Sequence, residues 1–328
     1  MENKVSIKPD RNVLKSQGNG VKSSGLIGRQ KGKVAELTAR NIFIVCAVIA
    51  ILAVGVITVY MIVMGTSAFK EVSVVDLIFG TVWQPTASEP SYGIAYIILS
   101  SILGTAVSVL IGVPIGLLTA AFLTEIAGKK VAGALQSAVE LLAAIPSVIY
   151  GLLGLMILNP LMFALEKQIY AGSTDHQFTG GANMISAVIV LAIMILPTVI
   201  NVSSSSLRAV PKDLRAASLA LGASKIQTIF KVTIPAARSG IMTGVVLGIG
   251  RAIGEAMAIN MVAGGSVNAP FPFNSVRFLT TQLVSEMGYA SGTHREVLFT
   301  VGLVLFIFIM VVNLVLMRIK KKGALDNG

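Results

Sequence analysis

Charged residues are scarce in this sequence. Only 12% of its 328 residues are Asp, Glu, Lys or Arg, whereas 54% are hydrophobic and the mean hydropathy is +0.82. A soluble globular protein carries about 25% charged residues, so this chain has too few polar side chains to cover a surface that faces water. The composition excludes an ordinary soluble enzyme and predicts a protein that is largely surrounded by lipid.

Cysteine and recognisable catalytic motifs are also lacking. Cys46 is the only cysteine, so neither a disulfide framework nor a cysteine-based metal site is available. His176 and His294 have no second ligand at metal spacing, and we expect both at the surface. No Walker-type loop, Ser-His-Asp order or pair of catalytic carboxylates is present. We therefore expect no catalytic residue, no metal and no cofactor bound by this chain.

Six apolar runs are long enough to cross about 30 Å of hydrocarbon. They lie at residues 41–65, 94–124, 133–158, 184–203, 237–264 and 297–317. The first run is longer than the core of a signal peptide and lacks a clear cleavage site, so we expect it to be a retained span. The sequence thus predicts an all-α polytopic membrane protein with six transmembrane helices.

Lysine and arginine are concentrated in alternate loops. With the amino terminus inside, the inner segments hold 21 of the 26 Lys and Arg residues, the outer segments hold four, and Arg251 lies within a span. Because cytoplasmic loops carry the excess of positive charge, both termini are predicted to be cytoplasmic. The net charge of +11 then reflects topology and attraction to anionic lipid, and we expect no nucleic-acid partner.

These assignments divide the chain into segments. In chain order we expect a basic, disordered cytoplasmic tail (1–40), the first transmembrane helix (41–65), an outer loop (66–93), a core of five transmembrane helices (94–317) with an inner loop (204–236), and a basic cytoplasmic tail (318–328).

One predicted span contains two opposite charges. In the string GRAIGEAMA, Arg251 and Glu255 are four residues apart, so they share a face of a continuous helix and can pair. A charge at mid-bilayer costs at least about 2.5–3.5 kcal/mol, and such residues usually face a cavity or mark a transport path. We predict that Arg251 and Glu255 line a substrate path. An ion pair that only fixes helix packing is the alternative.

The longest inner loop has the pattern of a helix, a turn and a second apolar patch. Pro211 suits a first helical position, and Leu214, Ala217 and Leu221 recur at helical spacing. Gly222 can then end the helix. Such an amphipathic elbow can fill a groove in a partner protein, or it can rest on the lipid surface.

This loop resembles that of the permease subunits of type I ABC importers. Their loop carries Glu-Ala-Ala, three residues, a glycine, nine residues and Ile-x-Leu-Pro. The present chain has Ala216-Ala217-Ser218, then Gly222, then Val232-Thr233-Ile234-Pro235 at the same spacings. Ala216 stands where the family usually has Glu and Ser218 where it has Ala, so the salt bridge that this Glu would give the ATPase is not carried over.

Four further strings resemble the permeases of phosphate importers, and the PstC type more closely than the PstA type. They are AAIPSVIYGLLGL (143–155), SLRAVPKDLRAASLALGAS, IPAARSGIMTGVVLGIGRAIGEAMA and LIFGTVWQP. The resemblance runs from about residue 40 to the end of the chain. It implies a MetI-like bundle with a cytoplasmic coupling helix, in a multi-pass protein of the bacterial inner (plasma) membrane.

The resemblance also implies partners. They are a second permease resembling the PstA type, two cytoplasmic ATPase subunits that hold ATP and Mg²⁺, an outer phosphate-binding protein and membrane lipid. The elbow, residues 211–231, would act as a rigid lever on which the ATPase docks. Coupling to the ATPase is carried over to Asp213, Leu214, Arg215, Ala216, Ala217, Ser218, Leu221, Gly222 and Ala223.

The outer segment at residues 265–296 has its own pattern. The turn-forming string APFPFN precedes a predicted amphipathic helix near residues 275–287. A structureless loop of this length would be uncommon. We expect this segment to face the binding protein or to gate the outer mouth.

Two other functions stay open on the sequence alone. The elbow motif indicates an ATPase partner and not the substrate, so an ABC permease for another oxyanion, molybdate or sulfate, is an alternative. A carrier driven by an ion gradient is a second alternative, although we find no convincing inverted repeat of the kind common in such carriers. ATP dependence of uptake would distinguish these two classes.

Overall fold

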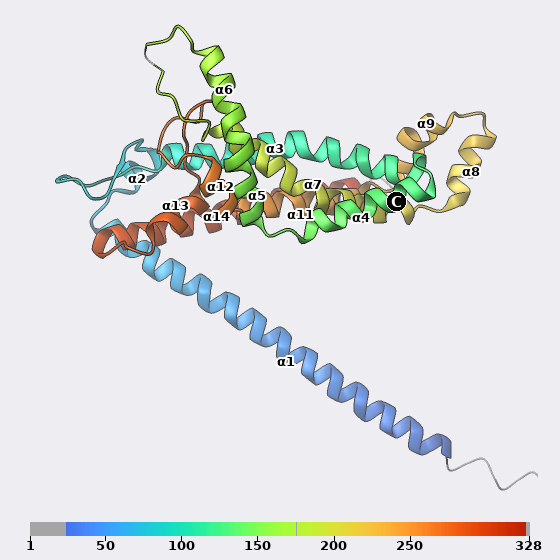
Figure 1. Cartoon of the computed structure of the whole chain (residues 1–328). Helices are drawn as coiled ribbons and strands as arrows, with labels where there is room; N and C mark the ends of the chain where they lie inside the picture. Colours follow the sequence, from blue (N-terminus) through green and yellow to red (C-terminus); the bar gives the residue numbers. More distant parts are fainter. Residues whose placement is uncertain (1–23, 175, 326–328) are drawn as a thin grey trace, which may run out of the picture. The chain divides into compact units, whose positions relative to one another are not determined.

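The computed structural model describes residues 24–174 and 176–325, which are mostly helical (Figure 1). The chain divides into two units, residues 1–60 and 61–328. The helices in chain order are α1 (Ser24–Ser67), α2 (Val74–Phe79), α3 (Ala95–Ala121), α4 (Lys129–Ala144), α5 (Ser147–Leu153), α6 (Asn159–Ile169), α7 (Met184–Arg208), α8 (Lys212–Ala220), α9 (Lys225–Thr228), α10 (Ile234–Ala236), α11 (Arg238–Gly254), α12 (Met257–Val262), α13 (Leu279–Glu286) and α14 (Gly292–Leu325).

Most of α1 belongs to the first unit. Its side chains from Glu36 to Ile57 are exposed, and its apolar part has a mean hydropathy of 3.2, which suits a helix surrounded by lipid. The helix begins at Ser24 and not at residue 41, because a helix formed by the apolar span extends readily through the Ala, Leu, Lys, Arg and Glu residues before it. Part of the expected tail is therefore helical, and residues 1–23 lie outside the described residues.

Helix α7 forms the centre of the second unit. Of its most apolar stretch, 61% is buried, compared with 33% or less for the other candidate membrane spans. Helices α3 and α11 pack along it. Glycines permit this close approach, because a Cβ atom at Gly112 of α3 would lie 2.7 Å from Ile195, and one at Gly248 of α11 would lie 3.1 Å from Val199.

The third membrane-length segment differs from the prediction. Residues 133–158 were expected to form one helix, but Ile145 and Pro146 are extended and separate α4 from α5. Proline has no N–H for the helix, and it disfavours helical conformation in the residue before it. The candidate span is instead Ser147–Ile169, which consists of α5, a π-helical turn and α6.

The number of spans agrees with the predicted fold class. Five helical segments of the described chain are long and apolar enough to cross a membrane. There is a sixth span if the two helical segments Lys225–Ala236 and Arg238–Gly254 are taken together as one span. These segments are bent by 73° relative to each other. At the carboxyl end, α14 continues through residue 325 and so includes most of the second expected tail. Residues 326–328 lie outside the described part of the chain.

The two ends of the second unit are built differently (Figure 1). At one end, α8 and α9 form the elbow, and we call this the elbow end. At the other end, α2 and α13 lie near a two-stranded ribbon of β1 (Trp83–Gln84) and β2 (Ser91–Tyr92), and we call this the ribbon end. The ribbon is antiparallel and pairs Trp83 with Tyr92. A buried cluster that includes Leu77, Ile97 and Leu279 joins α2, α3 and α13.

Candidate functional site

The predicted fifth span is interrupted in its apolar part. Helix α11 ends at Gly254, and α12 begins at Met257. Glu255 between them is extended, with φ −75° and ψ 126°. We call residues 254–256 the helix break. The expectation of one continuous helix over 237–264 was therefore wrong.

The side chain of Glu255 turns towards α12. Its Oε1 accepts a hydrogen bond from the Ala258 backbone N–H at 2.9 Å, and only 9% of the residue is exposed. A carboxylate in the first turn of a helix bonds N–H groups that have no helical partner and is favoured by the helix dipole. The carboxylate of Glu255 thus caps the amino-terminal end of α12.

Arg251 lies in the last turn of α11, before the break. It is partly exposed and makes no hydrogen bond or ion pair with any residue that the structure describes. The Tyr150 hydroxyl of α5 donates to the Leu142 carbonyl at 2.7 Å. The ion pair that the sequence allows between Arg251 and Glu255 is not formed among the described residues, because residues at i and i+4 meet only while the helix is continuous.

The elbow has the predicted helix, turn and helix. Helix α8 is followed by Gly222, whose φ of +85° is a conformation that glycine adopts without strain. Ser224 caps α9 by accepting the Gln227 N–H at 3.2 Å. Pro211 precedes the helix, with ψ at 137°, and does not occupy its first position. The sequence pattern therefore located the elbow to within one residue.

Two predicted coupling residues hold α8 in place through their side chains. Arg215 pairs with Glu125 at 2.8 Å and donates to the Leu207 carbonyl at 2.6 Å. The hydroxyls of Ser218 and Thr228 are 2.9 Å apart and join α8 to α9. Because these contacts attach α8 to the end of α7, to the π-helical turn after α3 and to α9, the elbow is held at several points.

The remaining coupling residues divide into two groups. One group lines an open and mainly apolar groove of about 470 Å³. It consists of Leu214, Ala217, Leu221 and Ala223, and Ser218 also lines this groove. Leu221 is 90% exposed. Asp213, Ala216 and Gly222 are exposed and do not line the groove. The structure thus brings together five of the nine predicted residues, while Arg251 lies near the far end of α11, about 20 Å along that helix from its first residue, Arg238.

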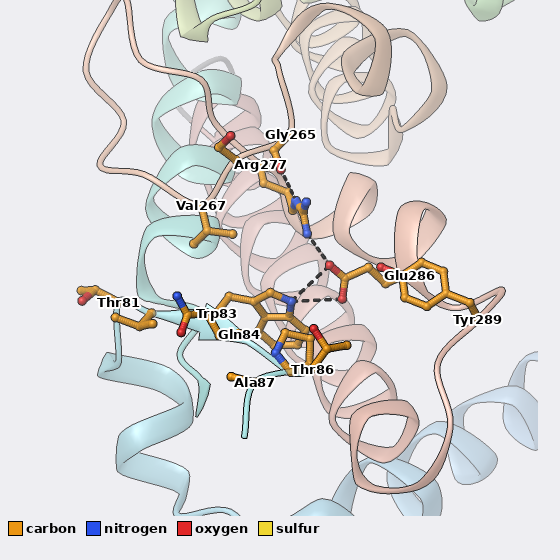
Figure 2. A pocket seen from close by; sticks show the side chains of 13 residues that line it. Thr81, Trp83, Gln84, Thr86, Ala87, Gly265, Val267, Arg277, Glu286 and Tyr289 are labelled. Atoms are coloured by element: carbon orange, nitrogen blue, oxygen red, sulfur yellow. Dashed lines mark hydrogen bonds and ion pairs between the residues drawn. The ribbon is translucent and has the colours of Figure 1, made fainter. Parts of the chain in front are cut away.

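A second polar site lies at the ribbon end (Figure 2). Glu286, at the end of α13, is 4% exposed. Its oxygens accept the indole N–H of Trp83 at 3.1 and 3.0 Å, pair with Arg277, and lie 2.8 Å from Nε2 of His294. Arg277 also donates to the Gly265 carbonyl at 2.6 Å. We call Trp83, Arg277, Glu286 and His294 the Glu286 cluster.

A cleft of about 640 Å³ lies beside the Glu286 cluster. Residues 81–87 line one part of it and residues 265–267 another, with Tyr289 at its edge. Burial, and then the charge of Glu286, raise the pKa of the Tyr289 phenol, while Arg277 acts in the opposite direction. Burial, and then Glu71, raise the pKa of Tyr92. Both phenols are therefore neutral near pH 7 and can donate hydrogen bonds.

Neither histidine lies free at the surface as expected. His294 is 8% exposed and is held by Glu286. His176 lies 2.8 Å from the fully buried carboxylate of Glu166, and its ring stacks on Tyr170 with 3.7 Å between ring centroids. Each histidine follows its glutamate by eight or ten residues in sequence. This spacing alone does not predict that the histidine and the glutamate touch. An irregular turn, and not a helical repeat, brings each pair together.

Comparisons with known proteins agree on one family. Residues 112–322 match the family described as binding-protein-dependent transport system inner membrane component. The chain is 40% identical over 297 residues to the probable ABC transporter permease protein YqgH of Bacillus subtilis, with 87% of this chain and 92% of that protein covered. It is 34% identical over 254 residues to the phosphate transport system permease protein PstC of Pasteurella multocida, with 73% and 79% covered.

A more distant relative and a solved structure extend these findings. The probable phosphate transport system permease protein PstC of Methanocaldococcus jannaschii is 31% identical, with 74% of this chain and 80% of that protein covered. A chain of a bacterial alginate ABC transporter in complex with an alginate pentasaccharide-bound periplasmic protein has a TM-score of 0.60 at 15% identity, with 88% of this chain and 96% of that chain covered. The likeness to the alginate transporter chain concerns the fold alone, and it confirms the expected permease bundle.

Truncation of Glu286 tests the cluster at the ribbon end. Glu286→Ala removes the ionic partner of Arg277, and breaking a largely buried ion pair costs about 3–5 kcal/mol. Because Trp83 is the only tryptophan, its fluorescence reports this site directly. We expect stronger quenching by acrylamide and a lower unfolding temperature in detergent. The exposed Glu89→Ala, in the loop between the two strands, is the control, and equal behaviour of the two variants would contradict the assignment.

Proposed function

The chain belongs to the family of binding-protein-dependent transport system inner membrane components, and we propose from this premise that it is a permease subunit of an ATP-driven importer of inorganic phosphate. The family makes it a transport component and not an enzyme, and it implies a separate ATPase and a binding protein. The relatives named as phosphate permeases support phosphate as the substrate. Another oxyanion, sulfate or molybdate, is the alternative, whereas a carrier driven by an ion gradient does not fit this family.

The observation that carries the proposal is Arg251 beside the helix break, with no ion-pair partner among the described residues. Non-helical backbone at membrane depth is tolerated only where protein surrounds it or where it lines a water-filled cavity, and interrupted helices form substrate sites in many transporters. A guanidinium binds two phosphate oxygens at once through parallel N–H groups. Arg251 would thus offset the large cost of moving an anion through a medium of low dielectric constant.

Two roles fit Glu255 in this mechanism. Between cycles, in a conformation with a continuous helix, it would pair with Arg251, so that no net charge stays buried. Alternatively, it accepts a hydrogen bond from a protonated phosphate oxygen. Sulfate is fully deprotonated at neutral pH and has no such hydrogen to donate. The second role would therefore favour phosphate over sulfate.

The elbow is proposed as the element that receives the work of ATP hydrolysis. Two ATPase subunits, which hold ATP and Mg²⁺, would dock on the groove around Leu221 and move the elbow as a lever. A second permease of the PstA type would complete the path, and an outer phosphate-binding protein would deliver the anion at the ribbon end. This arrangement places both termini in the cytoplasm of a bacterial cell, in agreement with the distribution of Lys and Arg.

Loss of the charge at Arg251 tests the path. In cells that lack their own phosphate importer, Arg251→Gln should reduce uptake of labelled phosphate to background, because no fixed charge then offsets the anion. The exposed Arg295→Gln should keep native uptake. Uptake is compared at equal amounts of membrane-inserted protein. Native uptake by the Arg251→Gln variant would refute the proposed path.

A charge in the elbow groove tests the docking of the ATPase. Leu221→Asp places a carboxylate in an apolar groove, so the ATPase should no longer be purified together with the permease. Leu219 lies two residues earlier, in the last turn of α8, is 50% exposed and does not line the groove, so Leu219→Asp is a matched control. Equal recovery of the ATPase with both variants would show that the groove is not the docking site.

A further inference from the structure

The first turn of α13 lies against the helix break. Its Thr280 donates the side-chain hydroxyl to the Glu255 carbonyl at 2.7 Å and is 8% exposed. Thr280 follows Glu255 by 25 residues, so this is a tertiary contact and not part of one helix. Helix α13 also packs on α12. A segment outside α11 and α12 thus bonds the backbone at the point where they separate.

The Glu255 carbonyl needs this donor. In a continuous helix, a carbonyl at this position accepts the N–H of the residue four positions later, which is Ile259. The extended conformation of Glu255 removes that partner, and a buried carbonyl without a donor costs about 1–3 kcal/mol. At membrane depth bulk water does not replace the lost donor. The Thr280 hydroxyl therefore stabilises the break itself.

Helix α13 is fixed at both of its ends. At its first residue, the Leu279 N–H donates to Ser101 Oγ of α3 at 2.8 Å, and the same hydroxyl donates to the Ile97 carbonyl at 2.9 Å. At its last residue, Glu286 binds its three partners in the Glu286 cluster. The hydroxyl of Thr280 is thus presented by a short helix that is attached to α3 at one end and to the ribbon at the other.

We propose that Thr280 is a positioning residue for Arg251. By holding the Glu255 carbonyl, it keeps the break open and the Glu255 carboxylate on α12, which leaves the Arg251 guanidinium free for the transported anion. Without the hydroxyl, the carbonyl regains a donor when residues 254–256 become helical. That change brings Glu255 within one turn of Arg251, where its carboxylate competes with the anion. The inference rests on the proposed function.

Three variants test this inference: Thr280→Val, Thr280→Ser and Thr300→Val. Thr280→Val removes the hydroxyl and keeps the shape of the side chain, whereas Thr280→Ser keeps the hydroxyl. Thr300→Val is the matched control, because Thr300 is 1% exposed and donates its hydroxyl to the Gly65 carbonyl at 2.6 Å. This contact between α14 and α1 does not involve the break. The three variants and the native chain are compared within the assembled transporter in lipid nanodiscs, and in cells at equal amounts of inserted protein.

Two readouts are measured on each variant. Amide hydrogen exchange at residues 255–259, without phosphate, reports whether the break has become helical. We expect slower exchange there in Thr280→Val only. The maximal rate of phosphate uptake should fall about tenfold in Thr280→Val, in line with loss of one buried hydrogen bond. Thr280→Ser should stay near the native rate.

Two results would overturn the inference. One is native uptake by Thr280→Val, and the other is loss of uptake with unchanged exchange at residues 255–259. If exchange slows but the native transporter itself takes up no phosphate, the proposed substrate is wrong while the effect of Thr280 on the break stands. The two failures are therefore distinguishable. A general loss of stability is recognised because Thr300→Val would then behave like Thr280→Val.

Discussion

A backbone carbonyl that leaves a helix inside a membrane must find another hydrogen-bond donor. At Glu255 this donor is the hydroxyl of Thr280, while the Glu255 carboxylate accepts the N–H of Ala258 in the first turn of the next helix. These two bonds make the break between α11 and α12 stable. The break separates Glu255 from Arg251. In the proposed mechanism, these two bonds therefore keep the Arg251 guanidinium available to the transported anion.

A π-helical turn, α10 and α11 join the elbow to the break. The elbow is held to the bundle by Arg215, which reaches both Glu125 and the Leu207 carbonyl, yet its apolar groove around Leu221 stays open. In the proposed mechanism, a partner that binds this groove and shifts the elbow therefore acts on Arg251 through α10 and α11. The ribbon end acts on the same break from the opposite side, through α13.

Features that depend on neighbouring residues could be predicted from the sequence, and features that depend on distant contacts could not. The elbow was predicted because helical spacing and Gly222 are local signals, and the helix near residues 275–287 was predicted in the same way, as α13. The break at Glu255 was missed, since its stability comes from Thr280. The expected surface position of His294 was wrong for the same reason, because its partner Glu286 is placed by a turn that no periodic pattern encodes.

The central claim is that Arg251 stays free of Glu255 in order to bind the transported anion. The most direct test is an experimental structure of the assembled transporter in lipid with phosphate trapped in the membrane path. The account predicts phosphate within hydrogen-bonding distance of the Arg251 guanidinium, with the Glu255 carboxylate still on the Ala258 N–H. Phosphate held elsewhere, with Arg251 paired to Glu255 along an unbroken helix, would contradict it.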